Sequence, residues 1–555
     1  MPLRRELGRD DASAGDLSHD TSDDAAATNQ HDETEDLDMI IVGAGFAGIW
    51  LLNRLRKRGF KAKIVEVNTC LSGMLLRSTL MKKARPDLTW AASGTGARVD
   101  SQYPVYALSI PEAFEDWTWS SHYPDHNELR EYFKHVDERL HIKKDCVFNA
   151  KVTDAVWDDA ECMWTSMYWI RSEALFPGLA RLRRLQRDNV SQLFLAEGRR
   201  RRQGQKRGSQ WCREIGEEGS VKMFQRTPNL ACPMNQVYMT KEEQKAIAKS
   251  LPERFADRNN HYNGFLYQWR ENLTYDHSEE EREEFYKMLW KMGGFRFLMN
   301  NYYDMTRNNE ANQQAYNFWR DRVRERVQDS RKGELLAPTE RPHLFGGKRL
   351  SLEQDFYDHF NRPNVDVIDV RTNPIDRFVA DGIVQKDGTH HKLDMIALAT
   401  GFDSITGGLK DMKISGIGGE QMSDKWAKGT WTYLGLATAR FPNFFFTYGP
   451  QAPTAFSNGP SCIEIQGDWI TDVLTDMRDK KLRKIDADPQ AEAEWKELVN
   501  DLINDTPRGK VDSWYNGANI PGKPREHLNY AGGIPRYKKT IEEVRANGYD
   551  GFHLS

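Results

Sequence analysis

A glycine-rich turn near the start of the chain, Gly43-Ala44-Gly45-Phe46-Ala47-Gly48, constrains the fold more than any other feature. It follows a short apolar run at residues 38–42 and opens a stretch with helical periodicity at residues 46–58. Residues 61–66 are then expected to form a second strand. A strand, a glycine turn, a helix and a second strand in this order predict an α/β fold built on a parallel sheet.

The three glycines have separate tasks in a turn that binds a dinucleotide. Gly43 permits the tight turn, Gly45 lets a pyrophosphate approach the backbone, and Gly48 allows the helix to pack close to the sheet. The helix N-terminus offers amide donors and a partial positive charge to the phosphates. Glu66 ends the second strand, where its carboxylate can accept both ribose hydroxyls, and an acidic residue there favours FAD or NAD over NADP. The alternative is a glycine turn that arose by chance.

Length and composition limit the other possibilities. At roughly 100–200 residues per domain, 555 residues suggest two or three domains. The 78 basic and 82 acidic residues give a net charge of −4, which argues against a nucleic-acid partner. No stretch approaches the ~20 apolar residues of a membrane span, and no apolar signal core follows the first arginines. The six cysteines contain no C-x-x-C pair, so we expect a cytoplasmic protein with reduced thiols and no metal site.

The pattern along the chain changes several times. Residues 1–37 are rich in Asp, Glu, Ser, Thr and Ala, and we expect them to form a disordered acidic leader. Residues 236–335 carry charged runs with aromatic residues at helical spacing, which predicts an all-helical insert. Short strands are expected at residues 365–370, 383–385 and 395–399, and a helical tail at 469–502.

Further motifs are spread over most of the chain. They are Gly96-Ala97-Arg98-Val99-Asp100-Ser101 with Tyr106, residues 224–229 (Phe-Gln-Arg-Thr-Pro-Asn), Lys348-Arg349-Leu350, residues 360–365, residues 398–403 (Leu-Ala-Thr-Gly-Phe-Asp), residues 448–460 and residues 512–523. As a set, although not singly, they resemble the motifs of the Baeyer–Villiger monooxygenases, flavoproteins that hold FAD and NADPH. The similarity is greatest to fungal members that act in secondary metabolism.

The resemblance implies an α/β fold with two Rossmann-like dinucleotide-binding domains and a helical insert. Residues 38–160 and 392–555 would form a discontinuous FAD-binding domain, and residues 161–235 and 336–391 an NADP-binding domain. The implied cofactors are FAD and NADPH, and the implied partners are a small-molecule ketone and dioxygen. The implied reaction inserts one oxygen atom next to the ketone carbonyl and gives an ester or lactone. We expect the substrate to be a bulky hydrophobic metabolite.

Arg349 is the residue expected to carry the chemistry. In the implied reaction, negative charge sits first on a flavin-bound oxygen and then on the ketone adduct. A permanently cationic guanidinium fork near both would stabilise the transition state. The resemblance implies Asp100 as the carboxylate that holds this arginine in place. The alternative is that Lys348 and Arg349 form a solvated basic pair.

Other motif residues are expected to bind the cofactors. Arg226 and Thr227 suit a ribose 2′-phosphate and hence NADPH rather than NADH. Lys348 is also expected to bind a cofactor. Arg226 could instead form a surface ion pair, and Trp514 could either donate its indole N–H to a cofactor or be a core tryptophan. Beside Asp100, the remaining candidates are Arg98, Val99, Ser101 and Tyr106, and Thr400 with Gly401, for which the alternative is an ordinary strand-ending turn.

Two blocks depart abruptly from the family pattern. Residues 74–95 replace a tryptophan-containing segment that wraps FAD. Residues 181–213 replace both an F-x-G-x-x-x-H-x-x-x-W-P fingerprint and a second G-x-G-x-x-G turn; Gly198, Gly204 and Gly208 have the wrong spacing, and no strand is expected before them. We interpret both blocks as translation artefacts of an intact gene, and the alternative is an altered, inactive paralogue. As written, the chain is expected to bind FAD weakly and NADPH poorly.

The basic 181–213 block and the function each leave further alternatives. A run of eleven basic residues could be a solvated face or a nucleic-acid-binding or nuclear-import segment. The rival functions are a flavin monooxygenase that oxidises nitrogen or sulfur, and a non-catalytic protein of the same fold. Arg349 in its Lys-Arg setting weighs against the first rival. A cDNA that encodes this chain as written would refute the artefact interpretation.

Overall fold

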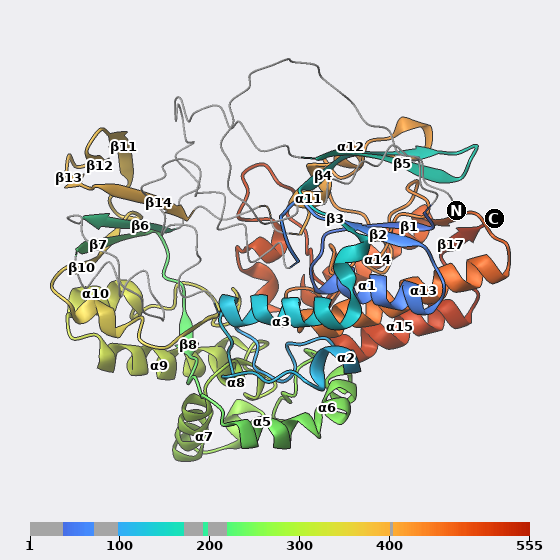
Figure 1. Ribbon diagram of the computed structural model, residues 1–555. Coiled ribbons are helices and arrows are strands. Elements are labelled where there is room, and N and C mark those ends of the chain that lie inside the picture. Colours follow the sequence, from blue (N-terminus) through green and yellow to red (C-terminus); the bar gives the residue numbers. More distant parts are fainter. Residues whose placement is uncertain are drawn as a thin grey trace, which may run out of the picture.

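The computed structural model describes residues 37–71, 98–170, 192–197, 219–399, 403, 405–504 and 506–555 (Figure 1). Its first sheet contains the predicted nucleotide unit. β1 (Met39–Val42) pairs in parallel with β2 (Ala62–Val65), with Met39 opposite Ala62, and β2 pairs in parallel with β3 (Cys146–Val147). α1 (Phe46–Lys57) connects β1 to β2. The strand–turn–helix–strand unit expected at residues 38–66 is therefore confirmed.

A second sheet, at the left of Figure 1, has the strand order β10–β7–β6–β14. β10 (Val365–Asp369) and β7 (Ser220–Gln225) are parallel, whereas β6 (Gln192–Glu197) is antiparallel to both β7 and β14 (Met395–Ala399). β7, β10 and β14 therefore end at one edge of the sheet and β6 ends at the opposite edge. β10 and β14 confirm two expected strands, but the expectation that no strand precedes Gly198 is wrong, because β6 ends one residue before it.

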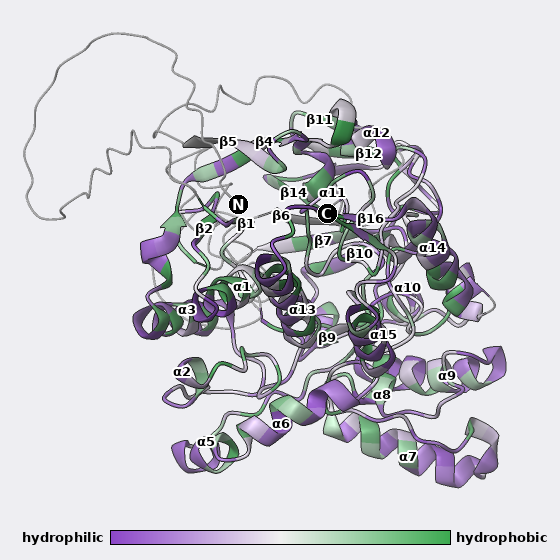
Figure 2. Ribbon diagram, turned by 90° about the vertical axis from the view of Figure 1, so that its right-hand side faces the viewer, coloured by the Kyte–Doolittle hydropathy of each residue, from purple (hydrophilic) through white to green (hydrophobic). Residues whose placement is uncertain are grey.

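The expected helical insert is present. Between residues 236 and 336 the structure has α5 (Lys241–Ala248), α6 (Leu251–Asp257), α7 (Glu279–Met292), α8 (Arg296–Met299), α9 (Asn309–Arg326) and α10 (Ser330–Leu336). Aromatic side chains fill its core; Phe297 and Phe318, for example, stack with ring centroids 5.3 Å apart. In Figure 2, α7 and α9 carry both hydrophilic and hydrophobic residues, as helices at a surface do. The short parallel pair β8 (Ala231–Pro233) and β9 (Ser351–Glu353) joins the two ends of this region.

A three-stranded sheet corrects one expected boundary. β4 (Ala150–Asp158) and β5 (Met163–Ile170) form an antiparallel hairpin, and β15 (Lys413–Ser415) adds to β4 in parallel. The division expected after residue 160 therefore falls within the turn of a hairpin. Both strands belong to one sheet because their backbone hydrogen bonds pair them with each other.

The C-terminal region covers the first sheet. α13 (Gly459–Asp479) packs against α1 so closely that a Cβ on Gly467 would lie 2.5 Å from Cδ1 of Trp50. The helical tail expected at 469–502 is interrupted: β16 (Ile485–Ala487), paired with β17 (Phe552–Leu554), separates α13 from α14 (Pro489–Asn504). α2 (Pro111–Phe114), α3 (His126–Leu140) and α15 (Ile534–Ala546) complete this side of the molecule.

Some expectations fall on residues that the structure does not describe. These are the leader through residue 36, block 74–95, most of block 181–213, and Thr400 with Gly401. Within the described residues, no helix is both long and apolar enough to cross a membrane. Across the same ranges, no group of His, Cys, Asp and Glu side chains is arranged to hold a metal ion.

Candidate active site

The glycine turn after β1 leaves room for a ligand where the sequence predicts a pyrophosphate. Gly43 has a φ of +100°, which makes a side chain costly there, and a Cβ on Gly43 or Gly45 would meet no atom of the described residues within 4 Å. A Cβ on Gly48 would lie 2.0 Å from the carbonyl oxygen of Gly43 and 3.4 Å from Cγ2 of Ile41. Gly48 is therefore required for packing of the helix on the strand, and Gly45 leaves an open approach to the backbone.

The N-terminus of α1 is free to bind phosphate groups. Its N-cap is Gly45, no side chain caps it, and its first turn carries no acidic residue. By contrast, α3, α7 and α9 are capped by Asp125, Ser278 and Asn308. Uncapped amides and the positive end of the helix dipole favour an anion at this place. The turn therefore fits the pyrophosphate of FAD.

Glu66 lies at the end of β2 and fixes the turn. Its side chain is only 3% exposed, and its two oxygens accept hydrogen bonds from the Ala44 amide (2.7 Å) and from the amide and side chain of Asn68 (2.8 and 2.5 Å). A carboxylate offers about four lone-pair positions, so acceptor capacity remains for a ribose. That Glu66 binds the ribose hydroxyls of FAD stays a prediction.

Arg349 and Asp100 form an ion pair between segments 249 residues apart in sequence. The Nε and Nη2 atoms of Arg349 donate to Oδ2 of Asp100 at 3.0 and 2.6 Å, and Nη1 donates to the carbonyl oxygen of Ala455 at 3.2 Å. The guanidinium carbon also lies 5.3 Å from the ring centroid of Phe295, which comes from the helical region. Three distant parts of the chain thus hold this one cation, as the resemblance implies for Asp100.

The surroundings keep Arg349 charged. Burial alone would lower the pKa of Arg349, but the Asp100 carboxylate, with Tyr515 and Tyr448 nearby, raises it above its ordinary value. Burial also raises the pKa of both tyrosines, so both are neutral phenols at ordinary pH. Neither tyrosine was predicted as a site residue, although both lie within the sequence motifs at residues 448–460 and 512–523.

Tyr106 links the ion pair to the nucleotide turn. Its ring packs edge-on against Phe46, the first residue of α1, at 5.3 Å between centroids. Burial and the nearby Asp100 carboxylate raise the pKa of Tyr106 to about 12. Ser101 donates its hydroxyl to Oδ1 of Asp100 at 3.2 Å. The expected residues Ser101, Tyr106, Asp100 and Arg349 are therefore brought together beside α1.

Arg98 and Val99 anchor the segment that carries Asp100. Arg98 donates from Nη1 to the carbonyl oxygen of Tyr123 at 3.0 Å, and the amide of buried Val99 donates to the carbonyl oxygen of Pro124 at 3.2 Å. These bonds attach residues 98–101 to the chain that enters α3. In this structure both residues position Asp100, and contact of either with a cofactor stays a prediction.

Arg226, Thr227 and Lys348 lie near one another. Arg226 and Thr227 directly follow the carboxyl end of β7. Burial lowers the pKa of Lys348, and the guanidinium of Arg226 lowers it further. Thr227 and Lys348 line the same cavity, of about 790 Å³. Two adjacent cations and a hydroxyl suit the 2′-phosphate of NADPH.

One strand of this sheet runs opposite to the other three. β7, β10 and β14 end at the edge of the sheet where Arg226 lies, whereas β6 ends at the opposite edge. The chain that follows β6, where the family pattern has its second glycine turn, lies outside the described residues. That the second nucleotide site is disrupted therefore stays a prediction.

Trp514 lies beside Tyr515, and the centroids of the two rings are 4.5 Å apart. It is half-buried, and no residue in the described part of the chain accepts a hydrogen bond from its indole nitrogen. This donor is available to a cofactor, as one of the two predictions for Trp514 requires. The rival prediction, a packed core tryptophan, also stays a prediction, because Trp514 packs against the buried cluster that includes Phe456 and Tyr515.

Known proteins similar to this chain are flavin-dependent monooxygenases, although no family model matches it. The FAD-binding monooxygenase acrE of Aspergillus aculeatus is 37% identical over 553 residues, covering 95% of this chain and 91% of the relative. Cyclopentanone 1,2-monooxygenase of Comamonas sp. is 35% identical over 547 residues, covering 94% and 96%. Phenazine N-monooxygenase PhzNO1 of Lysobacter antibioticus is 30% identical over 557 residues, covering 93% and 97%.

Solved structures similar to this chain also include a monooxygenase and complexes with FAD and NADP. The complex of OTEMO with FAD and NADP superimposes with a TM-score of 0.81 at 26% identity, covering 94% of this chain and 99% of that chain. Oxidized steroid monooxygenase bound to NADP gives a TM-score of 0.78 at 29% identity, covering 93% and 99%. Identity of this level over nearly the whole chain, together with the shared fold, shows that this chain belongs to the Baeyer–Villiger monooxygenase family.

Proposed function

We propose that this chain is an FAD-dependent, NADPH-using monooxygenase that inserts one oxygen atom of dioxygen next to a ketone carbonyl, giving an ester or lactone in secondary metabolism. The observation that carries the proposal is the Arg349–Asp100 ion pair beside the glycine turn. A guanidinium held by three parts of the chain stays fixed while charge develops near it. A preorganised cation of this kind is what a reaction through an anionic adduct requires.

Each part of the site has a task in this reaction. Gly43, Gly45 and the N-terminus of α1 would hold the pyrophosphate of FAD, with Glu66 on its ribose. When bound, FAD supplies the redox chemistry with dioxygen and NADPH supplies the electrons. Arg349 would stabilise negative charge on the oxygen of the substrate carbonyl as the carbon becomes tetrahedral. Asp100 is a positioning residue, because it aims the guanidinium and keeps it protonated.

The proposal is tested with purified full-length protein. We expect the protein to bind FAD and to oxidise NADPH faster when a ketone is added, with a product heavier than the ketone by one oxygen atom and carrying an ester carbonyl. Colourless protein that consumes no NADPH at saturating FAD would instead support the non-catalytic rival. The five described cysteines are free thiols, in keeping with the cytoplasmic location that we also propose.

A heteroatom-oxidising activity is the second candidate. The observation that favours it is the 30% identity to a phenazine N-monooxygenase over most of both chains. The two candidates differ in the product, because oxidation at nitrogen or sulfur leaves every carbon–carbon bond intact. Carbon-13 NMR of the product from a substrate with both a ketone and a tertiary amine would separate them: a new ester carbon supports our proposal, and an N-oxide alone supports the rival.

A further inference from the structure

The cavity beside Thr227 contains cations that no motif explains. It measures about 790 Å³ and lies between the N-terminus of α9, the segment before Lys348 and the segment 507–512. Thr227 and Lys348 belong to the proposed NADPH site, but three other basic residues on its wall were not part of any prediction. These are Arg307, Arg341 and Lys510.

The arginines of this cavity bond to neutral groups. Arg341 donates from Nη1 to Oδ1 of Asn312 at 2.5 Å and to the carbonyl oxygen of Asn309 at 3.4 Å. Arg307 donates to the carbonyl oxygen of Tyr303 at 3.0 Å and stacks on that ring at 4.1 Å. Within the described ranges, neither arginine has a carboxylate within ion-pair distance, and the same holds for Lys348.

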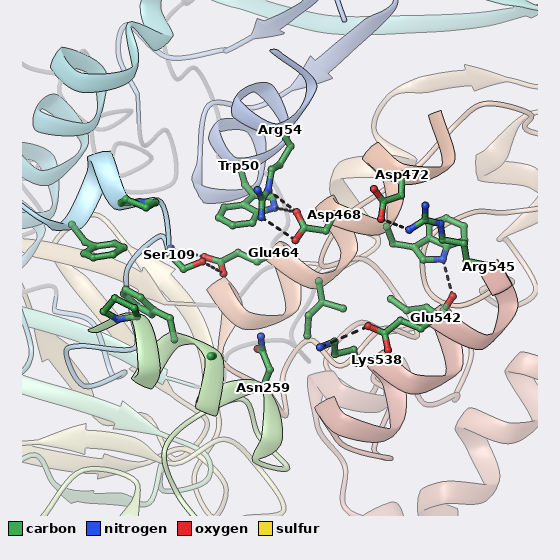
Figure 3. A pocket seen from close by; sticks show the side chains of 18 of the residues that line it. Trp50, Arg54, Ser109, Asn259, Glu464, Asp468, Asp472, Lys538, Glu542 and Arg545 are labelled. Atoms are coloured by element: carbon green, nitrogen blue, oxygen red, sulfur yellow. Dashed lines mark hydrogen bonds and ion pairs between the residues drawn. The ribbon is translucent and has the colours of Figure 1, made fainter. Parts of the chain in front are cut away.

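A second cavity on the other side of the molecule provides a comparison (Figure 3). It measures about 590 Å³ and lies among α1, α13, α15 and α6. Its basic residues are paired with carboxylates on its own walls or just beyond them. Arg54 binds Asp468 at 2.8 Å, Lys538 lies 3.7 Å from Glu542, and Arg545 pairs with Asp472. The cavity of Figure 3 therefore has compensated charges, whereas the cavity beside Thr227 does not.

The uncompensated charge is partly removed from water. Burial lowers the pKa of Arg341 and of Lys348 below their ordinary values. Only two carboxylates line the cavity against four cations, and one of these, Asp512, is held by Arg525 at 3.0 Å; the other is Glu310. Burial lowers the pKa of His343, also on the wall, to about 4, so it adds no charge near pH 7. Such cations are costly until an anion joins them.

Several cations around one cavity suit a phosphate group. Phosphate bound by several arginine and lysine side chains gives strong and salt-sensitive recognition.

We propose that Arg341, which lies outside every motif, is a specificity-determining residue for the 2′-phosphate of NADPH and binds it in this cavity beside Thr227 and Lys348. The proposal rests on the proposed function and extends it from the motif residues to Arg341. It predicts that a fragment carrying the 2′-phosphate binds more tightly than one without it, and that the difference depends on Arg341.

Isothermal titration calorimetry of the full-length protein tests this without turnover. The probes are adenosine 2′,5′-bisphosphate and adenosine 5′-monophosphate. We expect the bisphosphate to bind about tenfold or more tightly than the monophosphate, because hydrogen bonds to charged groups are the strong ones. Arg341→Gln should weaken the bisphosphate about tenfold and leave the monophosphate unchanged, with Arg341→Lys in between. Lys538→Gln, in the cavity of Figure 3, is the matched control and should change neither.

Two results would overturn the proposal: equal binding of the two fragments, or an Arg341→Gln variant that binds the bisphosphate like the parent. If Arg341→Gln fails to fold, the exposed Lys510→Gln variant and the salt dependence of bisphosphate binding take its place, and a flat salt dependence would refute the anion site. Failure of the proposed function is seen separately, in the FAD content and in the product formed from a ketone.

Discussion

Two single-methyl substitutions in the glycine turn separate folding from cofactor binding. In Gly48→Ala, the new Cβ would lie 2.0 Å from the carbonyl oxygen of Gly43, so the helix must move off the strand. Overpacking of this kind costs about 1–3 kcal/mol. In Gly45→Ala, the new Cβ meets nothing within 4 Å and the backbone at φ −88° accepts an alanine, so only the weaker N-cap is lost, at about 0.5–1 kcal/mol.

For FAD affinity we expect the opposite order, with the larger loss in Gly45→Ala and the smaller loss in Gly48→Ala. The Gly45 methyl group would occupy the open approach to the uncapped N-terminus of α1, so we expect FAD affinity to fall about tenfold or more, equivalent to ~1.4 kcal/mol. Urea unfolding of the FAD-free proteins, followed by tryptophan fluorescence, and FAD titration, followed by flavin fluorescence, measure the two effects. The reasoning is refuted if Gly48→Ala unfolds at the same urea concentration as the parent, or if Gly45→Ala binds FAD unchanged.

Four further substitutions test the ion pairs and the buried carboxyls. Asp100→Asn should lower kcat/KM for the ketone by about 10- to 100-fold at equal flavin content, because Arg349 loses a hydrogen-bonded charged partner worth about 1.5–3 kcal/mol. An unchanged kcat/KM would show that Asp100 does not position Arg349 for the reaction. Glu464→Gln should destabilise the protein by about 3–5 kcal/mol, read from the urea midpoint, because it leaves the fully buried Arg258 without a carboxylate, and adding Arg258→Met should recover part of this loss. Burial raises the pKa of Asp486 from 3.8 to about 6. The protonated carboxyl therefore adds to the free energy of unfolding, and this contribution is fully present below pH 3.8 and is lost as the pH rises through about 6. Asp486→Asn should abolish that pH dependence and stabilise the protein at pH 7 by about 1–2 kcal/mol. This is less than the ~3 kcal/mol that corresponds to a two-unit pKa shift, because the side chain is partly exposed. An unchanged dependence of stability on pH would contradict this.

The parts of the fold that the sequence predicted are those that local patterns encode. The nucleotide turn, the helical insert and strands β10 and β14 follow from glycine spacing and from hydrophobic periodicity over a few residues. The hairpin of β4 and β5 spans the boundary expected at residue 160, and the pairing of β16 with the distant strand β17 divides the helical tail expected at 469–502. Tertiary pairing of this kind leaves little signal in a short window.

The site residues also divide into those that a local pattern predicts and those that depend on tertiary contacts. The glycine spacing in residues 43–48 is enough to predict a nucleotide-binding turn. The contact between Arg349 and Asp100 joins residues 249 apart in sequence and could be predicted only from resemblance to a family. Tyr448 and Tyr515 matter because they are buried next to Arg349, and burial is a property of the folded chain. Arg341 was missed for a related reason, since only the structure shows that it lacks a carboxylate partner.

The central claim is that this chain inserts one atom of dioxygen beside a ketone carbonyl at a site organised by Arg349. The most direct measurement is the product of a cyclic ketone incubated with FAD-loaded protein and saturating NADPH under oxygen-18 gas, analysed by mass spectrometry and carbon-13 NMR. We expect a lactone that carries a single labelled oxygen in its ring. Recovery of unchanged ketone from protein that has bound FAD and consumes NADPH would contradict it.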